Sequence, residues 1–297
     1  MIEFTCPTVG DKKWVQEILS QCDFFTCESA FGNLYSYTAV MGVEIARIGG
    51  CLVVKWYTDK ELSYAYPLGK GDRKKAMEYI ISDGKRYNDN YTVFDVPPAY
   101  LEELAEFFPD MFEIKANRDA YDYIYSSEDL INLKGKKYQP KRDHISYFEK
   151  NNNWTYEKIT RKNIPECIAM SEKWLEKNKR EDNKPLEREL LIIKKSFDSF
   201  ETLGYVGGLL RVDGEVVAYT MGERMTDDMF CVHIEKAYAD IRGTYPMINR
   251  EFVKNELSSY KYIDREDDAG EENLRKAKLS YYPAIMAEKY EARVKKC

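Results

Sequence analysis

The stretch that decides the fold reads MFCVHIE from Met229 to Glu235, KAYADIRGT from Lys236 to Thr244, and then a helix-forming run from Tyr245. The first part is rich in β-branched and aromatic residues and predicts a strand, and the last part predicts a helix. A strand that leads into a helix offers a site for an anion, because the first helical turn has unpaired N–H groups and the positive end of the helix dipole. We therefore expect an anion-binding turn at this junction.

The junction itself reads Ile241-Arg242-Gly243-Thr244-Tyr245-Pro246. Gly243 lets backbone amides approach a ligand closely, and Arg242 adds a charged guanidinium. Pro246 suits the first helical turn, where its missing N–H costs little. Together these residues can hold a pyrophosphate. An ordinary strand-to-helix loop has the same short glycine pattern, so both interpretations stay open.

Composition bounds the class of protein. At 297 residues the chain is long for one core and suits two domains. With 44% hydrophobic and 32% charged residues it can bury a core. The net charge of −6 argues against general nucleic-acid binding, and we expect no DNA partner. The longest apolar runs are too short to span a membrane and the first residues lack a signal-peptide pattern, so we expect a cytoplasmic protein with no transmembrane segment.

Cysteine and histidine usage bears on disulfides and metals. The seven cysteines form no Cys-x-x-Cys pair, and an odd number spread over a long chain fits reduced thiols. Only His144 and His233 offer imidazole ligands, and neither lies in metal-ligand spacing. We therefore predict no metal.

Two similar runs of elements follow one another along the chain. In the first half, an opening helix over Lys12 to Leu19 precedes an antiparallel three-strand meander, predicted from alternating or β-branched runs at residues 43–48, 51–57 and 62–66, with turns at Gly49-Gly50 and Thr58-Asp59-Lys60. The turn Gly69-Lys70-Gly71 then leads to a helix that Asp72 can cap.

The second half repeats this order. A hairpin spans residues 205–223 around the Asp213-Gly214 turn, which favours the positive φ angles of a two-residue hairpin. The strand from Met229, the Arg242-Gly243-Thr244 turn and a helix complete the series. The shared order predicts an internal duplication, in which the Gly69-Lys70-Gly71 turn is either a second anion site or a relic.

The fold class that follows is α+β, with mixed, mostly antiparallel sheets flanked by helices in two domains, over residues 1–135 and 136–297. The junction falls in Lys134 to Arg142, where five of nine residues are basic and Gly135 and Pro140 act as breakers. This run is either a solvated linker or a contact for a polyanion, such as RNA or the head groups of a membrane surface touched peripherally.

Charged side chains near the organising stretch suggest chemistry. Because Val232 and Ile234 point the other way along a strand, His233 is expected to share a face with Glu235. Such a pair can act as base and orienter for an attacking amine or hydroxyl, and a buried hydrogen bond is the alternative.

A second charged group lies further along. Arg275 and Lys278 are three apart on a predicted helix, so both can face one cleft and neutralise a phosphate or a developing oxyanion, or else be surface charges. The acidic loop before that helix, with Asp264, Glu266, Asp267 and Asp268, can hold a cationic aminoacyl group or cap the helix.

The strand, Arg242-Gly243 turn and helix resemble a degenerate acyl-CoA turn of Gcn5-related N-acetyltransferases (GNAT), whose pattern has further glycines or alanines where Tyr245 and Met247 stand. Three segments resemble the phosphatidylglycerol lysyltransferase C-terminal domain (DUF2156) family more closely. They are YDYIYSSEDLINLKGKKYQPKRDHISYF (121–148), HIEKAYADIRGTYPMINREF (233–252) and YIDREDDAGEENLRKAKLSYYPAIMAEKY (262–290). The resemblance implies two tandem acetyltransferase-like domains, related to enzymes that take an aminoacyl group from aminoacyl-tRNA.

The resemblance also implies site residues. The middle motif is matched by His233, Glu235, Lys236, Gly243, Tyr245 and Asn249, and the last by Arg265, Asp267, Gly270, Leu274, Arg275, Lys278 and Pro283. Catalytic roles are expected for His233, Glu235, Arg275, Lys278 and Tyr281. The role of Tyr281, as a proton donor to a leaving thiol or hydroxyl, is that of a tyrosine near this place in many acetyltransferases. Donor binding is expected for Arg242, Gly243, Thr244, Tyr245 and Asn249, of which Gly243, Tyr245 and Asn249 match the family motif.

Two hypotheses follow. The first is an acyl- or aminoacyl-transferase that moves its group from acyl-CoA or aminoacyl-tRNA, bound as a substrate with no tightly held cofactor, to an amine or hydroxyl acceptor. It would use the place where the second domain's strand splays from its neighbour. The second is a non-catalytic GNAT-like module that binds a small anionic ligand or a protein partner.

Overall fold

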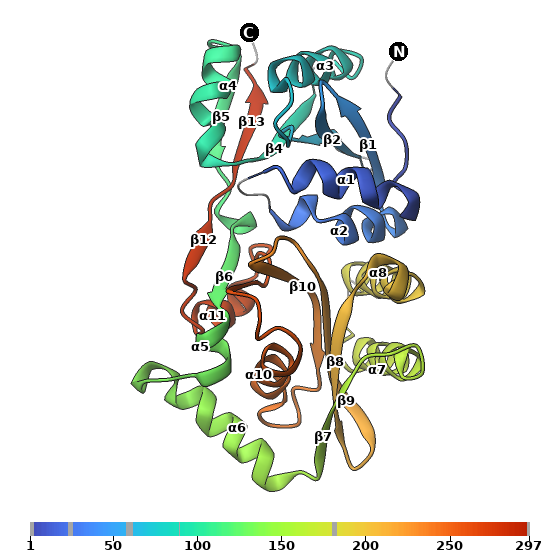
Figure 1. Ribbon diagram of the computed structural model, residues 1–297, viewed down its shortest axis with the longest axis vertical. Coiled ribbons are helices and arrows are strands. Elements are labelled where there is room, and N and C mark those ends of the chain that lie inside the picture. The colour runs from blue at the N-terminus through green and yellow to red at the C-terminus, as the bar shows by residue number, and fades with distance from the viewer. Residues whose placement is uncertain (1–2, 23–25, 58–61, 89, 180–182, 296–297) are drawn as a thin grey trace. The chain divides into compact units, whose positions relative to one another are not determined.

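The computed structural model describes residues 3–22, 26–57, 62–88, 90–179 and 183–295 (Figure 1). The turn predicted at Thr58-Asp59-Lys60 lies outside these ranges. The chain forms two compact units. The first consists of residues 1–122, 267–272 and 286–297, and the second of residues 123–266 and 273–285. Each has a mixed sheet flanked by helices, which confirms the predicted α+β class.

The first unit is built on a sheet in the order β1-β2-β3-β4-β13-β5. Strands β1, β2 and β3 form the predicted antiparallel meander, and β4 pairs with β3 in parallel after the crossover through α3. The Asp72 carboxylate caps α3 by accepting a hydrogen bond from the Lys75 amide. The elements are α1 (Lys12–Leu19), α2 (Phe31–Ser36), β1 (Gly42–Ile48), β2 (Cys51–Tyr57), β3 (Leu62–Ala65), α3 (Arg73–Lys85), β4 (Tyr91–Val96), α4 (Leu101–Phe107), β5 (Phe112–Ala116) and β13 (Tyr290–Val294).

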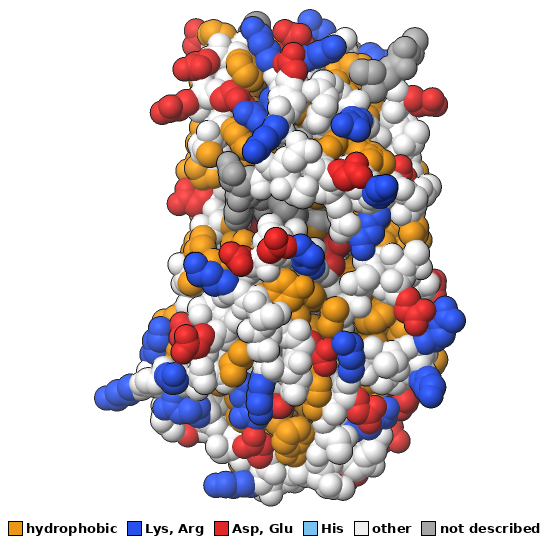
Figure 2. Space-filling model, in the orientation of Figure 1, with side chains coloured by type: hydrophobic (Ala, Val, Ile, Leu, Met, Phe, Trp, Pro, Cys, Tyr) orange, Lys and Arg blue, Asp and Glu red, His pale blue; other side chains and the backbone are white. Residues whose placement is uncertain are grey.

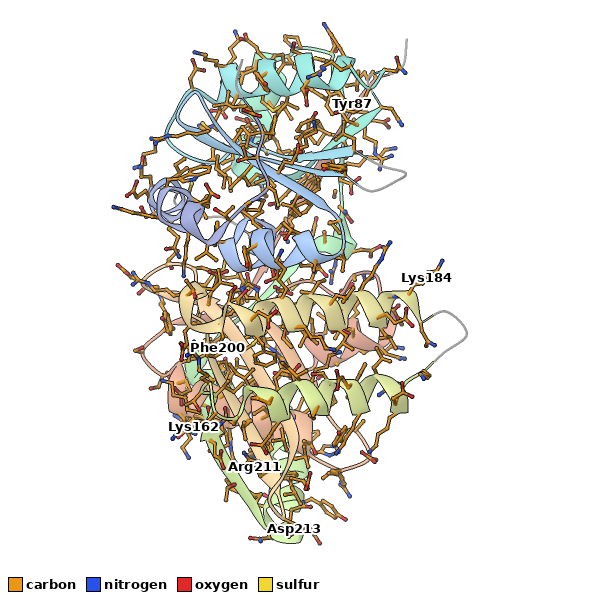
Figure 3. All side chains as sticks on the ribbon, turned by 90° about the vertical axis from the view of Figure 1, so that its right-hand side faces the viewer. Tyr87, Lys162, Lys184, Phe200, Arg211 and Asp213 are labelled. Carbon is orange, nitrogen blue, oxygen red and sulfur yellow. The ribbon has the colours of Figure 1, made fainter. Side chains whose placement is uncertain are left out.

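The second unit is built on a sheet in the order β12-β6-β11-β10-β9-β8-β7. Helix α10 covers one face of this sheet, and α7 and α8 lie side by side on the other (Figures 1 and 3). The elements are β6 (Asp122–Ser126), α5 (Ser127–Asn132), α6 (Gln139–Asn151), β7 (Trp154–Lys158), α7 (Ile164–Lys177), α8 (Lys184–Asp198), α9 (Phe200–Leu203), β8 (Val206–Val212), β9 (Glu215–Arg224), β10 (Met229–Ala237), α10 (Thr244–Glu256), β11 (Tyr262–Asp264), α11 (Glu272–Leu279) and β12 (Ile285–Ala287).

The two units repeat one connection. In the first, antiparallel strands lead through a glycine turn into α3 and then into β4, parallel to β3. In the second, antiparallel strands lead through a glycine turn into α10 and then into β11, parallel to β10. Gly69 and Gly243 occupy these turns, with φ angles of 122° and 92°. This shared order is the one expected from an internal duplication.

Each sheet also contains a strand contributed from the far part of the chain. After β5 of the first unit the chain enters β6, which lies between β11 and β12 of the second sheet. After β12 it enters β13, which lies between β4 and β5 of the first sheet. The compact units are therefore discontinuous in sequence, whereas the boundary predicted at residue 135 divides the chain into two consecutive parts. Strand pairing over such long separations leaves no local signal in the sequence.

No disulfide joins any two of the six cysteines that the structure describes. Among the described helices, none combines the length and the apolar character needed to cross a bilayer.

The buried position of β13 gives a test of this topology. Ala292 is fully buried in the core of the first unit, while its neighbour Arg293 points to solvent. We expect Ala292→Asp to lower the free energy of unfolding by about 3 kcal/mol or more, because it buries an unpaired carboxylate. Arg293→Asp should cost less than about 1 kcal/mol. Urea unfolding measures both, and equal small losses would show that β13 is not an inner strand.

Candidate functional site

The site begins where two strands separate. Strands β10 and β11 pair in parallel from Met229 opposite Tyr262 to Cys231 opposite Asp264. Beyond this point β10 continues to Ala237, whereas β11 ends and the chain continues as a loop. The edge of β10 beyond Cys231 is therefore no longer paired with β11. Side chains from the loop can reach it there.

A β-bulge interrupts β10 beside this divergence. The pairing of β10 with β9 shifts between Val232 and Ile234, so His233 is an extra residue in the ladder. The extra residue resets the alternation of side chains. Glu235 points to the α10 face, where it contacts Asn249, and His233 contacts residues on the opposite face. The expectation that His233 and Glu235 share a face is therefore wrong.

On its own face, His233 lies between two carboxylates. Its Nδ1 is 2.7 Å from Glu266 Oε1 and its Nε2 is 3.1 Å from Glu223 Oε1. Burial alone lowers the pKa of His233, but the two carboxylates outweigh burial and raise its pKa to about 10. At neutral pH the imidazole is therefore a cation that donates to both carboxylates. In that state it has no lone pair with which to accept a proton.

Glu235 is held across the divergence by Arg265, which follows β11 directly. The Arg265 Nη2 donates to Glu235 Oε1 at 2.8 Å, and the Asn249 Nδ2 of α10 donates to Glu235 Oε2 at 3.4 Å. Burial acts to lower the pKa of Arg265, but the carboxylate of Glu235 outweighs burial and raises it. Residues 265 and 266 thus send their side chains to opposite faces of the sheet and bind both faces of β10.

Two further groups surround Arg265 on the α10 face. Tyr281 is buried, and its ring lies 5.0 Å from the Arg265 guanidinium carbon and 3.9 Å from the Lys141 ammonium of α6. Burial, and then the charge of Arg265, lower the pKa of Lys141 to about 8, while burial raises the pKa of Tyr281. Tyr281 therefore stays protonated at neutral pH, and Lys141 exchanges a proton close to it. This side of the site combines two cations, one carboxylate and a phenol.

Lys278 supports this arrangement from behind. Its ammonium donates to the backbone oxygens of Arg265 at 2.5 Å and Glu266 at 3.1 Å, and its side chain is buried. Glu266 has a φ of 59°, so its backbone is strained as well as clamped. Lys278 thereby positions both site residues of the loop. Arg275, three residues earlier on α11, is half-buried.

The turn before α10 contains Gly243, and packing explains why glycine stands there. A Cβ added to Gly243 would lie 2.2 Å from the His144 carbonyl oxygen of α6, so glycine lets α6 pack against the start of α10. The Thr244 amide and hydroxyl both donate to the Ile241 oxygen, at 3.3 Å and 2.6 Å. The Arg242 guanidinium lies 4.5 Å from the Tyr147 ring. The contacts of Gly243 and Arg242 thus occupy the side of the turn that faces α6, and the Thr244 bonds close the turn itself.

The acidic loop shapes its own backbone. Asp264, Asp267 and Asp268 each accept a hydrogen bond from the amide two residues further on, at 2.8, 2.8 and 3.0 Å. Such bonds stabilise turns. Glu266 is the member of the loop whose carboxylate reaches His233.

Sequence reasoning missed Lys141 as a site residue. It treated the basic run from Lys134 to Arg142 as a junction, but Pro140 stands in the first turn of α6, where proline is tolerated. The run is thus partly the start of a helix, and that signal was available in the sequence. The partner Glu223 gave no signal, because it meets His233 only through the bulged pairing of β9 with β10.

Two groups bring together atoms of the kind that bind metals. Cys231, His233 and Glu266 place ligand atoms within 4.8 Å of one another, as do Cys27, Glu28 and Asp122 in the first unit. In the first group the imidazole is hydrogen-bonded to Glu266. In the second the Lys289 ammonium already bridges Glu28 and Asp122, at 2.6 and 2.8 Å. The absence of a metal stays a prediction.

With this geometry in place, comparison with known proteins defines the class. The chain is similar over 100% of its length, and 100% of the other chain, to a tandem GNAT protein from the clavulanic acid biosynthesis pathway, at 9% identity and a TM-score of 0.52. It is also similar to L-PGS from Bacillus licheniformis, at 12% identity and a TM-score of 0.67, over 98% and 93% of the two chains. The two units are tandem GNAT-like domains, which confirms the predicted fold.

Residues 20–293 match the family model described as phosphatidylglycerol lysyltransferase, C-terminal, and the chain belongs to this family. A conserved protein of unknown function from Bacteroides thetaiotaomicron VPI-5482 is 36% identical over 99% of this chain and 100% of its own, with a TM-score of 0.94. An uncharacterised protein of Mycoplasmoides gallisepticum is 24% identical over 66% of this chain. The match spans 65% of the length of that relative.

The packing explanation of Gly243 is testable. Gly243→Ala should lower the free energy of unfolding by about 3 kcal/mol or more, since it adds both a clash with α6 and the cost of a positive φ. Gly214→Ala, with a φ of 87° and open space around it, should cost about 1 kcal/mol. Chemical denaturation distinguishes the two. Equal losses of unfolding free energy for the two variants would show that packing against α6 does not require glycine at position 243.

The ion pairs of His233 predict a pH dependence. The ordinary histidine pKa is about 6.5, so the ion pairs contribute fully below about pH 6.5 and are lost as the pH rises through about 10. We expect the free energy of unfolding to fall over this interval by a few kcal/mol more in the wild type than in His233→Gln. Urea unfolding at a series of pH values measures the difference. His144→Gln, at the exposed histidine of α6, should follow the wild type; a wild-type slope in His233→Gln would contradict the assignment.

Proposed function

We propose that this protein is an aminoacyltransferase that moves an aminoacyl group from aminoacyl-tRNA to an amine or hydroxyl acceptor. The observation that carries the proposal is the cluster of Arg265, Lys141 and Glu235 beside the divergence of β10 and β11, in a chain of the phosphatidylglycerol lysyltransferase C-terminal family. Cations fixed in a buried setting stabilise developing negative charge more strongly than cations in water.

The reaction needs little more than position and charge. The acceptor's lone pair attacks the ester carbonyl, a tetrahedral oxyanion forms, and the bond from the carbonyl carbon to the ribose oxygen breaks. Arg265 and the charged form of Lys141 face the developing oxyanion. The leaving ribose oxygen takes a proton from Lys141, whose pKa of about 8 is close to neutral pH. The proton that the acceptor releases on attack then restores the charged form of Lys141. No covalent enzyme intermediate is required.

Two features favour aminoacyl-tRNA over acyl-CoA as the donor. The resemblance places an acyl-CoA pyrophosphate at the Gly243 turn, but α6 packs against that turn. The ion pairs of Glu235 with Arg265 and of His233 with Glu266 also link β10 to the loop after β11. A pantetheine chain that entered between β10 and that loop would have to break them.

Charge at the surface is consistent with a local rather than a broad RNA contact. Figure 2 shows acidic and basic side chains interspersed over the face it presents, and the net charge is −6. The basic residues that begin α6 and precede it are the candidates for phosphate contacts. Of these, the Lys134 ammonium lies 3.4 Å from an exposed Glu128 carboxylate, a pair that solvent screens.

A transfer assay tests the proposal. Labelled aminoacyl-tRNAs and acyl-CoAs are incubated with the protein and a mixture of amine and hydroxyl acceptors, and we expect transfer from the tRNA. Lys141→Ala should lower kcat/KM by about 100-fold and remove a decline of activity above about pH 8. Lys150→Ala, at an exposed position of the same helix, should leave both unchanged. Binding of a ligand without transfer of either donor would favour the non-catalytic module instead.

A further inference from the structure

Glu235 is surrounded by buried polar atoms that have no hydrogen-bond partner within the described structure. They are Thr220 Oγ1, Asn249 Oδ1 and Arg265 Nη1. Thr220 is fully buried and Asn249 is 3% exposed. Leaving such a group unsatisfied costs about 1–3 kcal/mol, so three around one carboxylate call for a partner.

These atoms not only lack hydrogen-bond partners but also lie close together. Thr220 of β9 stands directly opposite Glu235 of β10, and side chains of opposed residues point to the same face of a sheet. Asn249 reaches the same carboxylate from α10, and Arg265 reaches it from the loop after β11. Four different elements therefore converge on one position. A sheet core alone would be filled with apolar side chains here.

The atoms differ in whether they donate or accept a hydrogen bond. Asn249 Oδ1 and the Glu235 carboxylate accept hydrogen bonds, Arg265 Nη1 donates, and the Thr220 hydroxyl does either. A matching ligand needs N–H donors and an acceptor oxygen a short distance apart. A simple acyl group such as acetyl offers the oxygen but no donor, and would leave Asn249 unmatched.

We propose that Glu235, Asn249 and Thr220 bind the α-amino group of the aminoacyl donor while Arg265 Nη1 binds its ester carbonyl oxygen. This inference rests on the proposed aminoacyl transfer and specifies its substrate as an α-aminoacyl ester with a free amino group. The site recognises the part of the substrate that all amino acids share. It leaves the side chain to be selected elsewhere.

Charge in the site fits an uncharged amine. An α-amino group has an ordinary pKa of about 8, so it loses its proton readily. Arg265 and Lys141 both lie close to Glu235, and their two positive charges, which favour the neutral amine, outnumber the one carboxylate, which favours the charged amine. The neutral amine still offers two N–H donors, one for Asn249 Oδ1 and one for Glu235 or Thr220.

The test uses non-hydrolysable probes, the alanyl, lysyl, glutamyl and phenylalanyl amides of 3′-amino-3′-deoxyadenosine, with calorimetric titration of the full chain. For the tightest probe, replacing the α-amino group by hydroxyl should weaken binding by about 10- to 100-fold, as expected for a buried hydrogen-bonded group. Thr220→Val and Asn249→Leu should each weaken the amino probe by about tenfold and leave the hydroxyl analogue nearly unchanged.

Asn255→Leu is the matched control, because Asn255 lies on the same helix and its amide donates to the Glu251 backbone oxygen instead. Circular dichroism is used to check that each variant is folded. Equal binding of amino and hydroxyl probes, or unchanged binding by Asn249→Leu, overturns the inference; if the wild type still transfers from aminoacyl-tRNA, the proposed function stands. A wild type that binds no probe and transfers nothing overturns both.

Discussion

The single extra residue in β10 is the constraint on which the site depends. Without the bulge, His233 and Glu235 would project from the same face of the sheet; with it, they serve opposite faces. The loop after β11 matches this division, because Glu266 pairs with His233 on one face and Arg265 pairs with Glu235 on the other. Lys278 fixes the backbone of both loop residues. The bulge and the clamped loop therefore determine each other's geometry.

Local features of the fold were predictable from the sequence, and features set by distant pairing were not. The meander, the Asp72 cap and the Asp213-Gly214 hairpin follow from alternation, capping and turn chemistry over a few residues. The positions of β6 and β13 inside the sheets depend on partners more than a hundred residues away in sequence. The same holds within the site. Asn249 and Glu235 were identified by resemblance, whereas Thr220 becomes relevant only once the register of β9 is known.

Each unit contains a cluster of buried charged side chains. In both units the cluster links segments that are far apart in sequence. In the first unit the Lys289 ammonium, almost fully buried, binds Glu28 and Asp122. Burial lowers the pKa of Lys289, but the carboxylates outweigh burial and raise it well above its ordinary value. Removing one partner from such a cluster leaves an uncompensated charge, which is far more costly than the net gain of forming it. The cluster of the first unit links Asp122, the first residue of β6, to Lys289, which directly precedes β13.

Packing explains the glycines at both turns. A Cβ at Gly69 would lie 2.8 Å from Ile18, and one at Gly71 would lie 2.3 Å from the Gly49 oxygen. Gly243 is enclosed in the same way by α6. In both units the turn contains glycine where neighbouring chain packs against it. The unsatisfied polar atoms lie instead on β9, α10 and the loop after β11, so ligand recognition in the second unit is expected at the divergence of the strands.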